Sequence, residues 1–303
     1  MVELASLSRR DELHGHAAML AFSALVAGSF SLGGRVANDI DPLALTALRF
    51  VLASALIGAI GAYWGAFNRD VFRAAWRYAV LGGLMGGYFV LMFTGLKSAT
   101  PVSMAAVFTL TPLMAAIFAF WILRQFTTRR MAIALVIGAI GAIWVIFRAD
   151  LAALLSFRVG RGEIIFFFGC AMHALYIPLV PFLNRGEHVL VFTFGTMLGG
   201  AVLVGVIGVS RIMATDWGNL PMLVWIVLGY LVIFASGTSI ALVQYASFRI
   251  KAAKVMAYTY LIPSWVILWE IGLSGSVPTP VLLPGVGLTI VALTILLRED
   301  RVA

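Results

Sequence analysis

The sequence predicts an all-α integral membrane protein whose ten transmembrane helices form an inverted five-plus-five repeat. Three observations predict this class: an apolar composition, a series of bilayer-length apolar runs, and a motif that recurs in the second half. The 303 residues are 62% hydrophobic and only 11% charged, with a mean hydropathy of +1.03. A soluble domain carries about a quarter charged residues, so the composition excludes an ordinary soluble protein.

Ten apolar runs follow one another along the chain, and each is close to the ~20 residues that a bilayer-spanning helix needs. The first run continues well past a poor cleavage pattern, which favours a retained helix over a signal peptide. The predicted spans are residues 14–34, 43–64, 75–96, 102–123, 131–147, 163–183, 189–209, 221–246, 252–273 and 281–297.

The distribution of basic residues predicts the orientation. With the N-terminus on the cytoplasmic side, the cytoplasmic segments hold fourteen Lys and Arg residues and the opposite segments hold six. This asymmetry places both termini in the cytoplasm of a bacterial-type inner membrane and supports an even number of spans. The net charge of +8 therefore reflects topology and does not indicate nucleic-acid binding.

The least apolar stretch near the middle divides the chain into two halves, residues 14–148 and 162–298. Each half holds five predicted spans. Because five is odd, the second half enters the membrane from the opposite side, as in inverted-repeat transporters.

A proline motif recurs at matching positions of the two halves. Residues 106–112 read AVFTLTP, and residues 257–263 read AYTYLIP. Pro112 and Pro263 each fall inside a span and remove a helical hydrogen bond. Such interrupted helices point to the central site of a transporter, although a packing kink is the simpler alternative. The freed carbonyls near Phe108 and Thr259 are expected to meet a substrate ammonium group.

Glycines in the third span predict close helix packing. Gly82 and Gly86 are four residues apart and therefore share a helix face. Small residues on one face let membrane helices approach closely. We expect packing first, and a sliding surface for conformational change second.

Several local patterns resemble the EamA-type transporters of the drug/metabolite transporter superfamily. The resemblance covers the whole chain and is carried by residues 28–30 (GSF), 42–50 (PLALTALRF), 96–112 and 138–141 (GAIG). Overall, the chain is most similar to aromatic amino acid exporters of the YddG type. The resemblance implies ten helices in two repeats and outward transport. Arg124-Gln125 stand where the family often has Gly-Glu, and the second half lacks an equivalent of Arg49.

Aromatic and hydroxyl side chains at mid-membrane depth are the candidate substrate contacts. Apolar pockets with a few polar groups suit small aromatic or apolar solutes. A substrate carboxylate would meet a helix N-terminal end or a hydroxyl. The predicted substrate-binding residues are Tyr88, Phe108, Thr111, His173, Tyr176, Thr259 and Tyr260.

Arg49 and Glu270 are charged residues inside predicted spans, where charge is costly and usually paired or functional. Arg49 is expected to pair with Asp39 or Asp41, to extend toward the nearer surface, or to hold a gate shut. Glu270 is expected to carry a proton or meet an ammonium group, or to be solvated at the far interface.

Several function classes are disfavoured. The sequence has no phosphate-binding Gly-x-x-x-x-Gly-Lys-Ser/Thr loop and no His-Glu-x-x-His helix, so ATP hydrolysis and zinc proteolysis are not expected. We expect no cofactor and no metal. The single Cys170 excludes an intrachain disulfide. Oligomeric state is left open, and a monomer is compatible with the sequence.

The predicted function is therefore export of amino acids and related small solutes, by alternating access around the central cavity. Three alternatives stay open at this point. The nearest is a multidrug or quaternary-cation exporter of the same fold, which would need an acidic cavity. The others are a membrane enzyme acting on lipid-linked substrates and a channel.

Overall fold

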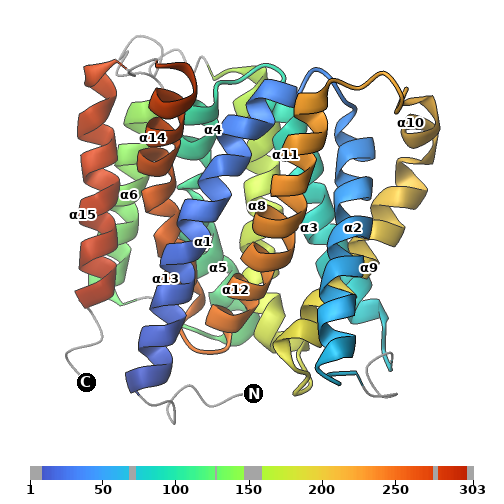
Figure 1. Ribbon diagram of the computed structural model, residues 1–303. Helices are drawn as coiled ribbons and strands as arrows, with labels where there is room; N and C mark the ends of the chain where they lie inside the picture. The colour runs from blue at the N-terminus through green and yellow to red at the C-terminus, as the bar shows by residue number, and fades with distance from the viewer. Residues whose placement is uncertain (1–8, 68–72, 127, 147–158, 276–278, 299–303) are drawn as a thin grey trace.

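The chain folds into a bundle of roughly parallel and antiparallel helices. The computed structural model describes residues 9–67, 73–126, 128–146, 159–275 and 279–298. Within these ranges the regular structure is helical throughout. Helix α1 begins and α15 ends at the same end of the bundle, which we call the lower face after its position in Figure 1.

The helices of the first half are α1 (Arg9–Val36), α2 (Pro42–Tyr63), α3 (Trp76–Leu96), α4 (Pro101–Phe108), α5 (Thr111–Leu123) and α6 (Arg129–Ile146). The second half contains α8 (Arg161–Leu183), α9 (Val189–Ile207), α10 (Val209–Ala214), α11 (Met222–Val232), the π-helical segment η3 (Ile233–Thr238), α12 (Ser239–Ser247), α13 (Ala252–Ala257), the 3₁₀ turn η4 (Tyr258–Leu261), α14 (Ile262–Ser274), the 3₁₀ turn η5 (Pro280–Leu282) and α15 (Leu283–Arg298).

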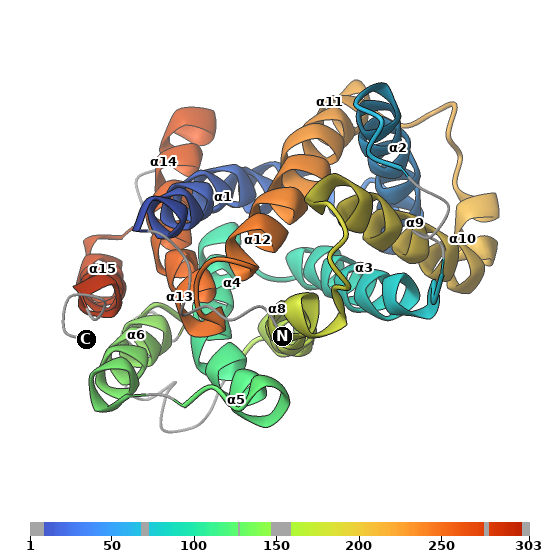
Figure 2. The same ribbon diagram turned by 90° about the horizontal axis from the view of Figure 1, so that it is seen from below.

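Eight helical segments in the described residues are long and apolar enough to cross a membrane. The protein is therefore a multi-pass integral membrane protein. These segments are Arg10–Val36, Pro42–Tyr63, Trp76–Leu96, Pro101–Leu123, Arg161–Leu183, Val189–Ile207, Met222–Ser247 and Lys254–Leu273. A shorter apolar segment, Pro280–Leu296, includes α15. Helices α6 and α15 pack against each other at one edge of the bundle (Figures 1 and 2).

Local sequence explains where helices begin. Asp41 caps α2, because its side chain accepts a hydrogen bond from the Leu43 N–H at 2.8 Å. Thr100 caps α4 in the same way, accepting from the Ser103 N–H at 3.3 Å. A proline follows each cap at the first helical position, where its missing N–H costs nothing.

The two halves interlock through α3. This first-half helix packs against both α8 and α9 of the second half (Figure 2). Glycine permits the contact with α9: a Cβ atom on Gly82 would lie 2.2 Å from the backbone nitrogen of Gly200, and one on Gly86 would lie 2.5 Å from a Val204 methyl group. The glycine face predicted in the third span therefore lies directly on another helix.

We predict that Gly82→Ala lowers thermal stability by about 1–3 kcal/mol, because the added methyl group overpacks a backbone-to-backbone contact. Gly205→Ala in α9 is the matched control, since a Cβ there meets nothing within 4 Å. Thermal unfolding of both variants in detergent checks this. Equal stability of Gly82→Ala and the wild type would mean that α3 and α9 can separate without cost.

Candidate functional site

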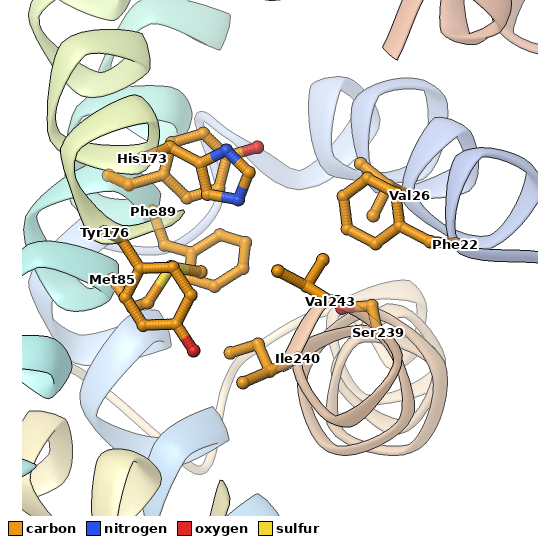
Figure 3. Close-up of a pocket in the computed structure, with 10 residues that line it drawn as sticks. Phe22, Val26, Met85, Phe89, His173, Tyr176, Ser239, Ile240 and Val243 are labelled. Carbon is orange, nitrogen blue, oxygen red and sulfur yellow. The ribbon is translucent and has the colours of Figure 1, made fainter. Parts of the chain in front are cut away.

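A small, nearly closed cavity lies in the interior of the bundle. Its volume is about 10 Å³, close to the space that one water molecule needs. Helices α1, α3, α8 and α12 each supply part of its wall (Figure 3). The lining residues are Phe22, Val26, Met85, Tyr88, Phe89, His173, Tyr176, Ser239, Ile240 and Val243.

Three predicted substrate contacts line this cavity: Tyr88, His173 and Tyr176. The imidazole of His173 lies between aromatic rings. Its centroid is 4.6 Å from that of Tyr88 and 6.3 Å from that of Tyr176. Phe22 of α1 faces it from across the cavity, 6.4 Å away and nearly parallel. Half of the lining residues thus carry a ring, and the rings come from both halves.

Two polar atoms in this wall have no protein partner among the described residues: the hydroxyl oxygen of Tyr88 and Nδ1 of His173. Tyr88 is 1% exposed and His173 is 2% exposed. A buried polar atom without a hydrogen bond costs about 1–3 kcal/mol. Tyr88 and His173 therefore each carry a hydrogen-bonding atom that no described protein group satisfies.

Phe108 lies one layer behind the cavity. Its ring packs against Tyr88 at 5.6 Å and against His173 at 5.2 Å, measured between centroids. Phe30 and Phe166 complete this layer, at 5.8 and 6.1 Å from Phe108. Phe108 supports the cavity wall and does not form it.

Gln244 holds Tyr176 in place and was missed by sequence reasoning. Its Nε2 donates to the Tyr176 hydroxyl at 2.9 Å and approaches the Thr196 hydroxyl at 3.2 Å. The hydroxyl of Thr193 donates to its Oε1 at 2.6 Å. The single amide side chain within the span 221–246 is the signal that could have found it.

Each predicted proline break is present. Helix α4 ends at Phe108 and α5 begins at Thr111, while α13 gives way to the turn η4 and α14 begins at Ile262. Pro112 and Pro263 both occupy the first turn of the following helix. Neither proline lines the cavity.

Hydroxyl groups compensate the carbonyls at the first break. Thr109 donates to the Ala106 carbonyl at 2.6 Å, and Thr111 donates to the Phe108 carbonyl at 2.6 Å. The hydroxyl oxygens of Thr111 and Thr259 lie 3.3 Å apart, so the two breaks meet inside the protein. In this conformation the Phe108 carbonyl already has a donor and is not presented to a substrate.

Tyr260 lies away from the cavity. Its ring packs against α6, where a Cβ atom on Gly138 would lie 2.4 Å from the Tyr260 hydroxyl oxygen. Its carbonyl accepts a hydrogen bond from Thr289 of α15 at 3.0 Å. Its hydroxyl has no partner among the described residues. Its position within an apolar span predicted its depth in the membrane but not the side to which it points.

Arg49 is fully buried and bonds to η3, not to Asp39 or Asp41. Its Nε donates to the Ser236 hydroxyl at 2.9 Å, and its Nη2 donates to the Ala235 carbonyl at 3.1 Å. The guanidinium carbon also lies 3.8 Å from the centre of the Phe89 ring. Asp41 instead caps α2.

Glu270 is half-buried in α14 and does not line the central cavity. Within the described ranges, no group of three His, Cys, Asp or Glu side chains is placed to hold a metal ion.

At the lower face, a groove of about 820 Å³ separates α2 from α12. Its outer end includes Glu187 and His188, and its inner end includes Ile57, Gly237 and Thr238. Because Gly237 and Thr238 belong to η3, the groove reaches the segment that holds Arg49.

An ion pair joins the two halves beside this groove. Arg77 of α3 donates through Nη2 to Glu187 at 2.5 Å and through Nη1 to the Leu183 carbonyl at 2.6 Å. Partial burial alone would raise the pKa of Glu187, but hydrogen bonds from Arg77 and from the Arg185 N–H outweigh this and lower the pKa below its usual range.

A lowered folded-state pKa means that the pair stabilises the protein above the unfolded-state pKa, near 4.3 for Glu, and that this stability is lost as the pH falls through the folded-state value. We predict that acidification from pH 7 to about 3, through the lowered folded-state pKa, lowers the Tm of the wild type more than that of Glu187→Gln. Asp39→Asn, which removes an exposed carboxylate on the upper face, is the control and should show the same fall in Tm as the wild type. Parallel wild-type and Glu187→Gln curves would show that the pair adds no stability.

A model of the EamA-like transporter family matches the chain twice, over residues 13–147 and 160–298. The chain therefore belongs to the EamA-like transporter family and is a membrane transporter. It is 28% identical over 249 residues to the uncharacterized transporter YyaM of Bacillus subtilis (strain 168), with 81% of each protein covered. A protein of known crystal structure has the same fold, with a TM-score of 0.72 at 20% identity over 98% of this chain and 100% of the other.

Proposed function

We propose that this protein is a secondary transporter that exports amino acids, aromatic and other neutral ones, together with related small solutes. The observation that carries this proposal is the central cavity. Aromatic rings form half of its lining, and Tyr88 and His173 each carry a buried polar atom without a partner among the described residues. This combination suits a small solute with an apolar side chain and polar groups at one end. The similarity to aromatic amino acid exporters of the YddG type implies the same substrate class.

The proposed architecture has ten spans in two inverted halves, residues 14–148 and 162–298. The two family-model matches, at 13–147 and 160–298, support this division. The paired packing of α6 and α15 supports counting them as the fifth span of each half. Pro112 and Pro263, each opening a second helical segment, support the internal repeat.

The transport cycle is proposed to be alternating access. A cavity of about 10 Å³ cannot hold an amino acid, so the helices around it must separate to admit one. The glycine contact between α3 and α9 and the Arg77–Glu187 pair both join opposite halves. They are the contacts that a rocking motion would have to slide or break. The proline breaks supply hinges for the same motion.

The lower face is proposed to be cytoplasmic in a bacterial-type inner membrane. The basic residues Arg77, Arg185 and Arg249 all lie at or near the lower ends of their helices, as the positive-inside rule requires. A monomer contains every residue that lines the cavity.

Counterflow in sealed proteoliposomes tests the function. Vesicles are loaded with unlabelled neutral amino acids and given labelled phenylalanine outside. We expect saturable accumulation that vanishes in empty vesicles. Labelled tetraphenylphosphonium tests the cation-exporter alternative, which the lining residues disfavour because none of them is acidic. Exchange of the cation without exchange of phenylalanine would reject the amino acid proposal.

We predict that Tyr88→Phe raises the apparent KM for phenylalanine roughly fivefold, because one substrate hydrogen bond contributes about 1 kcal/mol. Tyr63→Phe is the matched control, since Tyr63 is 88% exposed at the end of α2 and its hydroxyl should not matter. An unchanged KM in Tyr88→Phe would place the substrate elsewhere.

A further inference from the structure

Arg49 carries a charge in the interior of a membrane protein, and it has no carboxylate partner among the described residues. Its side chain is 0% exposed, and its two hydrogen-bond partners, Ser236 and Ala235, are neutral. Its Nη1 has no partner among the described residues. A guanidinium has five N–H donors, and burying its charge unpaired costs several kcal/mol. An anion bound at this position would therefore stabilise the buried guanidinium.

Arg49 lies directly behind the cavity wall. The Phe89 ring lines the cavity, and the guanidinium carbon is 3.8 Å from its centre. The Ala235 carbonyl that accepts from Arg49 at 3.1 Å also accepts from the Ser239 hydroxyl at 2.8 Å, and Ser239 lines the cavity as well. A single aromatic side chain thus separates the charge from the space that the substrate is proposed to occupy.

The π-helical segment η3 creates this arrangement. A π-helical turn contains an extra residue and is frequent at functional sites. Here it turns the Ser236 hydroxyl and the Ala235 carbonyl toward α2, where they hold one edge of the guanidinium. The lower-face groove ends at Gly237 and Thr238 of the same segment. The hydrogen bonds to η3 therefore fix the position of the Arg49 guanidinium. The lower-face groove reaches the same segment.

We propose that Arg49 is the anion-binding residue of the central site, and that its open Nη1 edge receives the carboxylate of the solute when Phe89 turns aside. This inference rests on the proposed function and specifies its substrate class: solutes with a carboxylate next to an aromatic or apolar group. Arginine pairs with carboxylates through parallel, charge-assisted hydrogen bonds. The solute's ring would take up the aromatic contacts that Phe89 leaves with Tyr88. Amides and amines of the same shape would lack the ion pair.

The first test uses the wild-type protein in detergent and needs no variant to fold. Thermal stabilisation is titrated with 3-phenylpropionate and phenylalanine, and with their uncharged-headgroup counterparts 3-phenylpropionamide and phenylalaninamide. We expect each carboxylate to bind about 30-fold more tightly than its amide, the loss that follows removal of one member of a buried charged pair. Equal affinity of carboxylate and amide, or no binding of either carboxylate, overturns the proposal.

The second test is the variant Arg49→Gln. It should lose this carboxylate preference, so that acid and amide bind alike. Arg49→Lys keeps the positive charge but loses the paired N–H donors of the guanidinium. It should therefore retain part of the carboxylate preference. Arg35→Gln, the same substitution at an exposed arginine at the end of α1, should keep the full preference. A full carboxylate preference in folded Arg49→Gln would place the anion site at another residue.

The outcomes also separate this inference from the proposed function. Stabilisation by 3-phenylpropionate that depends on Arg49, together with no counterflow of phenylalanine, would retain the anion site and reject amino acids as the substrate. Saturable phenylalanine counterflow without any carboxylate preference would retain the proposed function and reject the role of Arg49.

Discussion

Hydrocarbon offers no hydrogen bonds, so every polar group within the membrane must find its partner inside the protein. The rest of this structure depends on that constraint. The break before Pro112 is tolerated because the hydroxyls of Thr109 and Thr111 donate to carbonyls of the preceding turn. At the second break, Thr289 of α15 donates to the Tyr260 carbonyl. Gln244 is accommodated because Thr193, Thr196 and Tyr176 surround its amide.

The same constraint gives meaning to the atoms that lack partners. Tyr88 and His173 line the central cavity, Arg49 lies behind Phe89 of its wall, and each of the three carries a buried polar atom without a partner among the described residues. A fold optimised for stability alone would have paired them or replaced them with apolar side chains. We interpret their grouping as a site that is completed by the solute. The cavity is nearly closed in this conformation, so the aromatic side chains fill the space until the solute displaces them.

The contacts between the halves connect this site to motion. Helix α3 contributes Tyr88 and Phe89 to the cavity, Gly82 and Gly86 to the contact with α9, and Arg77 to the ion pair with Glu187. One helix therefore links the cavity wall, a smooth glycine surface and a lower-face ion pair. A shift of α3 against α9 would change all three together, because packed interfaces move between discrete arrangements and do not deform continuously.

The sequence by itself determined the class of the protein, the approximate helix ends and the two proline breaks. These follow from local quantities: hydropathy over about 20 residues, and the absence of an N–H on proline. It also placed Tyr88, His173 and Tyr176 among the candidate substrate contacts, and these three line the central cavity. Only the tertiary structure decided that Tyr260 points toward α6, that Gln244 anchors Tyr176, and that Arg49 bonds to a π-helical segment 186 residues away. Helical periodicity assigns a residue to a face, but which neighbour covers that face depends on packing between distant segments.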